Sequence, residues 1–221
     1  MSEISVQIAG KQHLHLAETI CKEMEESAKV RGTGIAKRDP NYICKKMEEG
    51  KAIIAVTKDG KFAGFCYIET WGHGNYVSNS GLIVVPEFRK YGLATKIKHK
   101  AFELTRSKYP EAKLFGLTTS AAVMKINAEL GYRAVTFGEL TDDEEFWKGC
   151  QGCVNYPILE SKDKKMCFCT GMLYDPKEKE EERWDFIKKS KLYESWQQLK
   201  THKFFNMFHN KKKDSLKIMM S

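Results

Sequence analysis

The sequence lacks several features that would place it in a specialised class of protein. It contains no run of eighteen apolar residues, and its first eight residues do not combine a basic start with an apolar stretch. The first absence argues against a membrane-spanning helix, and the second argues against a secretory signal peptide. We also find no internal repeat and no low-complexity tract. These absences favour an ordinary globular protein.

A concentrated basic surface is also missing. The formal net charge is +8, from 37 Lys and Arg against 29 Asp and Glu, and the lysines are mixed with glutamates except at Lys211–Lys213. Without a basic stripe interleaved with aromatic residues, nucleic acid is not an expected partner. A positive balance equally suits anionic small molecules such as CoA or a dicarboxylate. A solvated surface accounts for most of these charges.

The length and composition of the chain fit one domain with an extension. The chain has 221 residues, and 42% of them are hydrophobic, which is enough for a core. Its seven cysteines, in a chain with no export signal, are expected to be reduced thiols or metal ligands. These features predict a cytoplasmic protein that neither enters nor crosses a membrane.

Hydrophobic periodicity and turn residues predict an α/β fold. Helices are expected at 13–30, 40–49, 93–109 and 121–130, and strands at 6–8, 52–57, 62–69, a segment ending at 85, 114–118, 132–137 and 166–173. The predicted domain covers residues 1–174. Residues 175–221 are densely charged, with aromatic residues at helical intervals, and predict a C-terminal helical extension. Such a helix packs on the domain or on a partner, which makes a homodimer plausible.

The most informative stretch runs from Gly81 to Thr95. An apolar, β-branched strand leads through a short turn into a helix that begins at Gly92. A helix N-terminus offers free N–H groups and a positive dipole end, the combination that holds a phosphate group. Gly92 allows close approach of the phosphate, the small side chain of Ala94 leaves room beside it, and Arg89 adds a cation. The stretch therefore predicts a phosphate-binding turn.

The spacing Arg-x-x-Gly-x-Ala after Val-Val-Pro resembles the GNAT superfamily of acyl-CoA-dependent N-acyltransferases. The resemblance implies a GNAT-type mixed sheet, splayed at its centre and flanked by helices, and an enzyme with acetyl-CoA or succinyl-CoA as co-substrate. In such enzymes the splayed strand binds the pantetheine arm and the turn binds the pyrophosphate. Carried onto this sequence, the cofactor-binding residues are Ile83, Val84, Val85, Arg89, Lys90, Tyr91, Gly92, Leu93, Ala94, Thr95 and Asn127. A plain buried strand also explains residues 83–85, and both interpretations can hold together.

Acyl transfer to an amine requires a neutral amine and a donor to the carbonyl oxygen, and the leaving thiolate can take a proton. Some family members carry a glutamate base on the strand before the turn, but the matching position here is about Ser78. Glu69 and His73 are the nearby candidate bases, against the alternatives of a solvated strand-end carboxylate and a turn residue. The family's thiolate-protonating tyrosine is replaced by Asn127. Asn127 remains a candidate donor to the CoA arm, and the sequence identifies no general acid.

Substrate selection in the family falls to the loop between the first two helices. Here that loop carries Arg31, Lys37 and Arg38. Arginine suits a carboxylate, so the loop predicts an acidic acceptor; a solvated basic loop is the alternative. Asn79 and Ser80 are expected to orient the acceptor or the thioester.

Two segments, at 25–36 and 146–150, resemble a bacterial GNAT subgroup linked with arginine biosynthesis, whose members acylate the α-amine of glutamate. This resemblance implies transfer of an acetyl or succinyl group to a small acidic amino acid. Two alternatives stay open: a GNAT for another small amine or a protein amine, and a regulatory module that binds CoA without turnover.

Four cysteines have spacings typical of a metal site: Cys150, Cys153, Cys167 and Cys169. The first pair forms a Cys-x-x-Cys knuckle, and the second pair, if placed on a strand, shares one face. Four thiolates would hold a closed structural zinc ion. Reduced core thiols are the alternative.

Overall fold

The computed structural model describes residues 3–32 and 37–178. Residues Met1–Pro176 group into one compact unit. The predicted extension over 175–221 lies almost entirely outside the described residues and stays a prediction.

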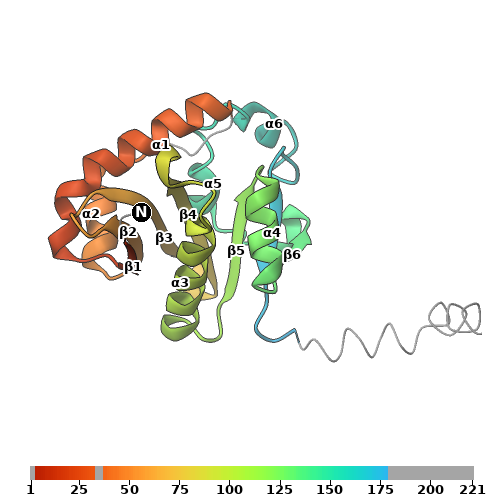
Figure 1. The fold of residues 1–221 in the computed structure, drawn as a ribbon. Helices are drawn as coiled ribbons and strands as arrows, with labels where there is room; N and C mark the ends of the chain where they lie inside the picture. Colours follow the sequence, from red (N-terminus) through yellow and green to blue (C-terminus); the bar gives the residue numbers. More distant parts are fainter. Residues whose placement is uncertain (1–2, 33–36, 179–221) are drawn as a thin grey trace, which may run out of the picture. The chain divides into compact units, whose positions relative to one another are not determined.

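The unit is built on one seven-stranded mixed sheet with the order β1-β2-β3-β4-β5-β7-β6 (Figure 1). The strands are β1 Ile4–Ile8, β2 Ala52–Thr57, β3 Phe62–Trp71, β4 Tyr76–Val84, β5 Lys113–Thr118, β6 Arg133–Val135 and β7 Thr170–Tyr174. The helices are α1 Ala17–Arg31, α2 Pro40–Glu48, α3 Leu93–Lys108, α4 Ala121–Glu129, α5 Glu144–Lys148 and α6 Tyr156–Ser161. All neighbouring strands are antiparallel except β4 and β5, which are parallel.

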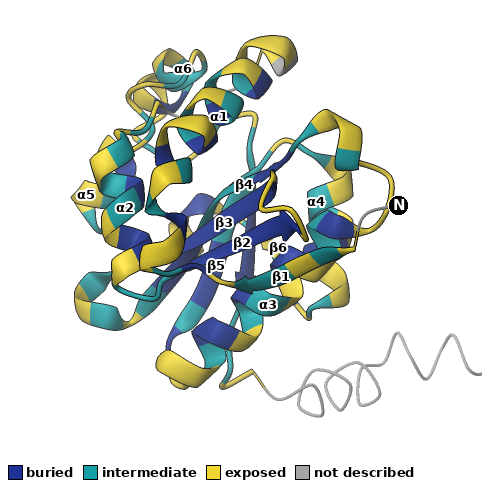
Figure 2. Ribbon diagram, turned by 60° about the vertical axis from the view of Figure 1, so that its left-hand side comes forward, coloured by how far each residue is buried: buried dark blue, intermediate teal, exposed yellow. Residues whose placement is uncertain are grey.

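Helices cover both faces of the sheet. On one face, α1 and α2 pack on β2 and β3 through residues such as Ile20 and Ile43, and α5 and α6 pack on β5 and β7. On the other face, α3 packs on β2–β4 through Ile97 and Ala101, and α4 lies over β5 and β7. Burial therefore concentrates in the central strands, while the outer helix faces are exposed (Figure 2). Closely packed layers of this kind fix the positions of the strand ends.

Local sequence explains where two of the helices begin. Asp39 accepts a hydrogen bond from the N–H of Asn41, and Pro40 occupies the first position of α2. Ser120 caps α4 by accepting from the N–H of Val123. Both capping residues also line the site described below, so the caps fix part of its wall.

The two parallel strands at the centre separate. Residues 76–78 of β4 pair with residues 113–115 of β5, and the pairing stops there. Both strands continue, β4 to Val84 and β5 to Thr118, and Figure 1 shows them diverging. The register of β4 against β3 also shifts near Gly81, whose φ is +66°. A Cβ there would lie 2.7 Å from the Tyr67 ring, which explains the glycine.

The structure confirms the predicted α/β fold and splayed sheet and corrects some boundaries. The strand expected at 132–137 is only Arg133–Val135, and α5 and α6 were not predicted. The last strand begins at Thr170 rather than 166, because its partner strand β5 ends at Thr118, opposite Thr170. Cys167 and Cys169 consequently precede the strand and do not share a strand face. Within the described residues, no helix is long and apolar enough to cross a membrane.

Candidate active site

The gap between β4 and β5 opens into a cavity of about 630 Å³. The strands contribute residues 79–82 and 116–118 to its walls. Residues from both faces of the sheet complete it: Arg38, Tyr42, Phe146 and Cys150 on the α1, α2, α5 and α6 face, and Lys98, Val123 and Asn127 on the α3 and α4 face. The cavity is therefore lined from both faces of the sheet, at the point where β4 and β5 separate.

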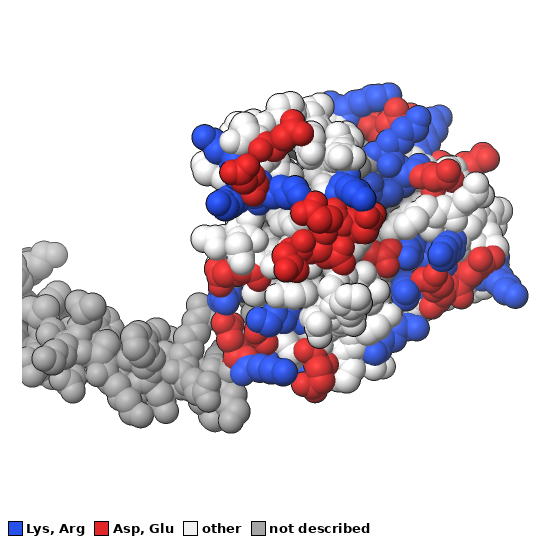
Figure 3. Space-filling model, turned by 180° about the vertical axis from the view of Figure 1, so that it is seen from behind, with Lys and Arg blue, Asp and Glu red and all other residues white. Residues whose placement is uncertain are grey.

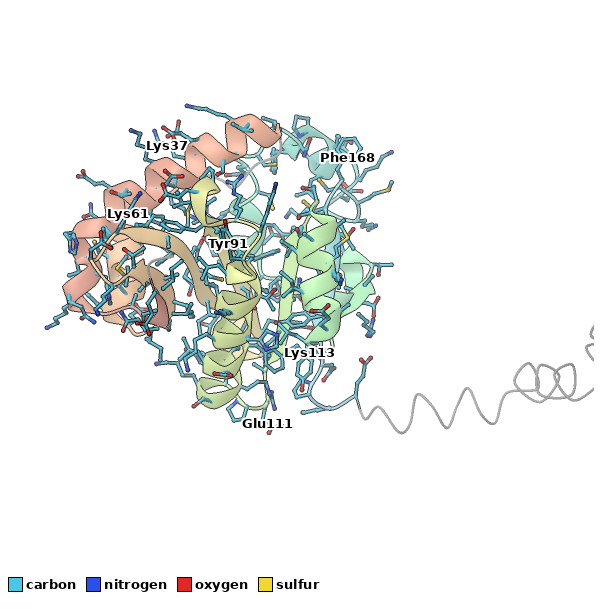
Figure 4. All side chains as sticks on the ribbon, viewed as in Figure 1. Lys37, Lys61, Tyr91, Glu111, Lys113 and Phe168 are labelled. Atoms are coloured by element: carbon cyan, nitrogen blue, oxygen red, sulfur yellow. The ribbon has the colours of Figure 1, made fainter. Side chains whose placement is uncertain are left out.

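The predicted phosphate turn lies at the end of β4, directly before α3. Lys90 and Gly92 both have φ of +70°, and Gly92 is the N-cap of a 16-residue helix. The first N–H groups of such a helix have no partner within the helix and point outward. A Cβ on Gly92 would meet nothing within 4 Å, and Tyr91 is 59% exposed at the start of α3 (Figure 4). The turn is therefore open to a ligand, as a phosphate site requires.

The predicted cofactor residues 83–85 connect this turn along the chain to residues 79–82 of β4, which line the cavity. Ile83 and Val84 are buried at the end of β4, and Val85 follows them. Arg89 folds back toward the strand: its Nε donates to the Val84 carbonyl at 2.9 Å, and Nη2 contacts the Ser27 hydroxyl at 3.3 Å. Arg89 thus anchors the turn to β4 and α1, in addition to supplying positive charge.

Most of the predicted substrate residues reach the cavity. Lys37, Arg38, Asn79 and Ser80 line it. The Nε of Arg38 donates to the Tyr67 hydroxyl at 2.8 Å, which helps to orient the guanidinium. Arg31 ends α1, and its side chain lies outside the described residues.

The two candidate bases do not line the cavity. The Glu69 carboxylate accepts a 2.6 Å hydrogen bond from Tyr42 and forms an ion pair with the buried Lys46. Burial, the neighbouring Tyr67 and the Glu69 carboxylate raise the pKa of Tyr42, so its hydroxyl stays protonated and donates. His73 lies in the β3–β4 turn with φ of 55°, away from the phosphate turn. Their catalytic roles remain predictions; Tyr42, which donates to Glu69, does line the cavity.

A polar group on the α3 and α4 face was not predicted from the sequence. The Lys98 side chain is 3% exposed, and its ammonium donates to Oδ1 of Asn79 at 3.0 Å. Tyr132 donates to the same oxygen at 3.2 Å. Burial lowers the pKa of Lys98 and raises that of Tyr132. A lysine at position 98 interrupts the apolar face of α3, and this interruption was the available signal.

The four clustered cysteines line one wall of the cavity as free thiols. Burial, together with the neighbouring thiols, raises the pKa of Cys150 to about 11 and of Cys169 to about 12. Within the described residues, however, no group of three or more His, Cys, Asp or Glu side chains is arranged to hold a metal ion. The zinc ion stays a prediction of the sequence, which metal analysis of the purified protein tests.

Comparison with known proteins assigns the family. Residues 17–125 match the model of the acetyltransferase (GNAT) family. A search of curated proteins found no match.

Three solved structures share the fold at low sequence identity. The Neisseria gonorrhoeae N-acetylglutamate synthase, in complex with coenzyme A and N-acetylglutamate, aligns with a TM-score of 0.56 at 15% identity; the alignment covers 79% of this chain and 35% of that one. The chain thus spans only about a third of the synthase. A Staphylococcus aureus GNAT acetyltransferase aligns with a TM-score of 0.55 at 11% identity, and the alignment covers 79% of this chain and 100% of that one. Diaminobutyrate acetyltransferase from Paenibacillus lautus aligns with a TM-score of 0.53 at 8% identity, and the alignment covers 80% of this chain and 96% of that one.

The family match spans the phosphate turn and the splayed strand, and the described geometry agrees with the motif that first indicated them. The chain belongs to the GNAT family of acyl-CoA-dependent N-acyltransferases.

Proposed function

We propose that this N-acyltransferase moves an acetyl or succinyl group from CoA to the α-amine of a small acidic amino acid, with glutamate the first candidate and arginine biosynthesis the expected setting. The observation that carries the proposal is the pair of cations, Lys37 and Arg38, on the cavity wall opposite α3 and α4. Arginine can bind a carboxylate through two parallel hydrogen bonds.

The two halves of the cavity suit two different reactants. The acyl-CoA would lie along β4 from the phosphate turn, with its thioester at the point where β4 and β5 separate. The amino acid would enter from the α1 and α2 face, with its carboxylate toward Arg38. Holding both in one geometry supplies much of the rate enhancement in acyl transfer.

The charge distribution and the structural relatives support this choice. Figure 3 shows both acidic and basic side chains on one face of the unit, so the positive charge of the chain is not gathered over that face. Two relatives of the same fold are named for amino-acid substrates, glutamate and diaminobutyrate. The cations of this cavity favour the acidic one, because like charges would repel a diamine.

Thiol release tests the proposal. Purified protein is incubated with acetyl-CoA or succinyl-CoA and one acceptor from a panel of glutamate, aspartate, glutamine, diaminobutyrate and a polyamine, and free CoA is measured with a thiol reagent. Release with glutamate and little with glutamine supports the proposal. Release with the amines favours another small-amine or protein-amine acceptor. Tight CoA binding without release for any acceptor favours a regulatory module.

A further inference from the structure

Lys98 is a buried cation without a carboxylate partner. It comes from α3, the helix that begins at the phosphate turn, and it lines the cavity. Its hydrogen-bond acceptor is the neutral amide of Asn79, and within the described residues no carboxylate forms an ion pair with it. Burying a charge in this way is costly, so a lysine here is unfavourable for folding unless something else requires it.

Two other buried polar atoms of the cavity wall have no hydrogen-bond partner in the described part of the chain. Nδ2 of Asn79 and Oδ1 of Asn127 are buried, and neither makes a hydrogen bond within the described part of the chain. Both residues line the cavity, one from β4 and one from α4. An open donor and an open acceptor on the cavity wall match the amide groups of a pantetheine arm, which carries both C=O and N–H. Because the Asn79 side chain also accepts from Lys98, an arm bound to it would pass beside that lysine.

The thioester sulfur is expected at the end of that arm, where β4 and β5 stop pairing at Ser78 and Phe115. Asn79 is the next residue of β4, and its side chain turns to the α3 and α4 face, where it meets Lys98 and Tyr132. On the other face at this level, Nε1 of Trp71 donates to the Ser78 hydroxyl at 2.7 Å, and both residues line the cavity. The lysine ammonium thus lies on the α3 and α4 face, on the helix that begins at the phosphate turn.

We propose that the Lys98 ammonium is the acid that protonates the departing CoA sulfur, and this inference rests on the proposed acyl transfer. The neutral amine of the acceptor attacks the thioester carbon and forms the C–N bond. The C–S bond then breaks, its electron pair stays on sulfur, and Lys98 transfers one proton to that sulfur. The acceptor nitrogen loses one proton to water, and Lys98 takes a proton back from solvent through the cavity. The products are the amide and CoA thiol.

This role explains how the site works with Asn127 at the position where the family often has a tyrosine. An asparagine side chain cannot supply a proton at neutral pH, whereas a lysine whose pKa is lowered by burial lies closer to a thiol of pKa about 8.5. The titratable groups around Lys98 are the Cys66 thiol of β3 and the Tyr132 phenol. Burial raises the pKa of both, Cys66 to about 11, so both are neutral near pH 7.

The test compares the protein with Lys98→Met, which keeps the length of the side chain and removes its charge. Tyr132→Phe is the matched control, because it removes the other donor to Asn79 and keeps the ring. Calorimetry first measures CoA binding by each protein. The absorbance of the thiolate between pH 6 and 10 then gives the pKa of the bound CoA thiol, without any acceptor present.

We expect the pKa of the bound CoA thiol to be at least about one unit lower in the unmodified protein and in Tyr132→Phe than in Lys98→Met. One unit corresponds to a roughly tenfold difference in the ratio of thiolate to thiol. With a working acceptor, Lys98→Met should lower kcat by about a hundredfold. It should also remove the fall in kcat at high pH that deprotonation of Lys98 causes.

An equal thiol pKa in all three proteins that bind CoA would overturn the inference. A fall in the kcat of Lys98→Met with succinyl-CoA but not with acetyl-CoA would also overturn it, because the lysine would then bind the carboxylate of the succinyl group. A lowered thiol pKa with no turnover of any acidic amino acid would support the role of Lys98 while rejecting the proposed acceptor. No CoA binding by the unmodified protein would reject both.

Discussion

The two sides of the cavity are built in different ways. On the proposed CoA side, the phosphate turn and the end of β4 form one continuous segment, and the groups proposed to bind CoA are mainly main-chain atoms. On the acceptor side, the wall combines side chains from distant parts of the chain, such as Arg38, Tyr67 and Phe146. A backbone site depends on local conformation, whereas a side-chain site depends on how the whole fold packs. Substitutions on the two sides should therefore differ in what they change and by how much.

The largest effect is expected at the phosphate turn. Gly92→Leu places a side chain where a phosphate must approach, and losing two charge-assisted hydrogen bonds of about 1.5 kcal/mol each weakens CoA binding by roughly a hundredfold. Gly60→Leu is the control, since Gly60 also has positive φ and open space around its Cβ, but lies in a remote hairpin. Both should lose about 1–2 kcal/mol of stability. Calorimetry with CoA measures the difference, and equal affinities would remove the turn from the cofactor site.

A smaller and more selective effect is expected on the acceptor side. Arg38→Leu removes the guanidinium that would bind the substrate carboxylate, so KM for glutamate should rise by about tenfold to a hundredfold. CoA affinity should stay unchanged, since the CoA side is separate. Tyr67→Phe is the control for the 2.8 Å hydrogen bond that orients Arg38. Steady-state kinetics with saturating acetyl-CoA measures both, and an unchanged KM in Arg38→Leu would show that the loop cation is only a solvated surface charge.

Lys98 should affect the stability of the folded protein. The pKa of Lys98 is lower in the folded protein than its ordinary value of 10.5, because burial disfavours the charged form. The unfolded chain therefore binds more protons, and folding is penalised at pH values below the folded pKa; the penalty disappears as pH approaches 10.5. Lys98→Met should add about 1–3 kcal/mol of stability at neutral pH. Urea unfolding at pH 7 and pH 10.5 measures this gain, which should shrink at the higher pH.

The smallest effect on catalysis is expected at Glu69. Its carboxylate is bound by Tyr42 and Lys46 and does not line the cavity, so Glu69→Gln should lower kcat by less than about tenfold. Thermal unfolding of the same variant separates a loss of activity from a loss of fold. A hundredfold or greater fall in kcat, with the melting temperature preserved, would instead identify Glu69 as the base.

The contrast between the two sides also explains what the sequence could predict. The turn at Gly92 and the strand before it are consecutive residues, so their order alone indicates a phosphate site, and the structure finds the turn open. Strand boundaries depend on partners elsewhere in the chain. The last strand begins at Thr170 because β5 ends opposite it, and no pattern within 166–173 contains that information.

Side-chain sites are harder to predict for the same reason. Lys98 interrupts the apolar face of α3 in the sequence, but only the packing of α3 shows that it is buried against Asn79. Glu69 appears well placed at a strand end, but α2 brings Tyr42 and Lys46 to its carboxylate. In both cases the deciding neighbour is separated by at least nineteen positions in the chain.

The short pairing between β4 and β5 has a mechanical consequence. Only residues 76–78 and 113–115 join the two halves of the sheet by strand pairing. Past that point, each central strand has an unpaired inner edge, like the edge strands that other proteins must protect from aggregation. A cofactor arm lying in this gap would act as an additional strand and fasten the two halves together. Amide hydrogens in residues 79–84 should therefore exchange more slowly once the cofactor is bound.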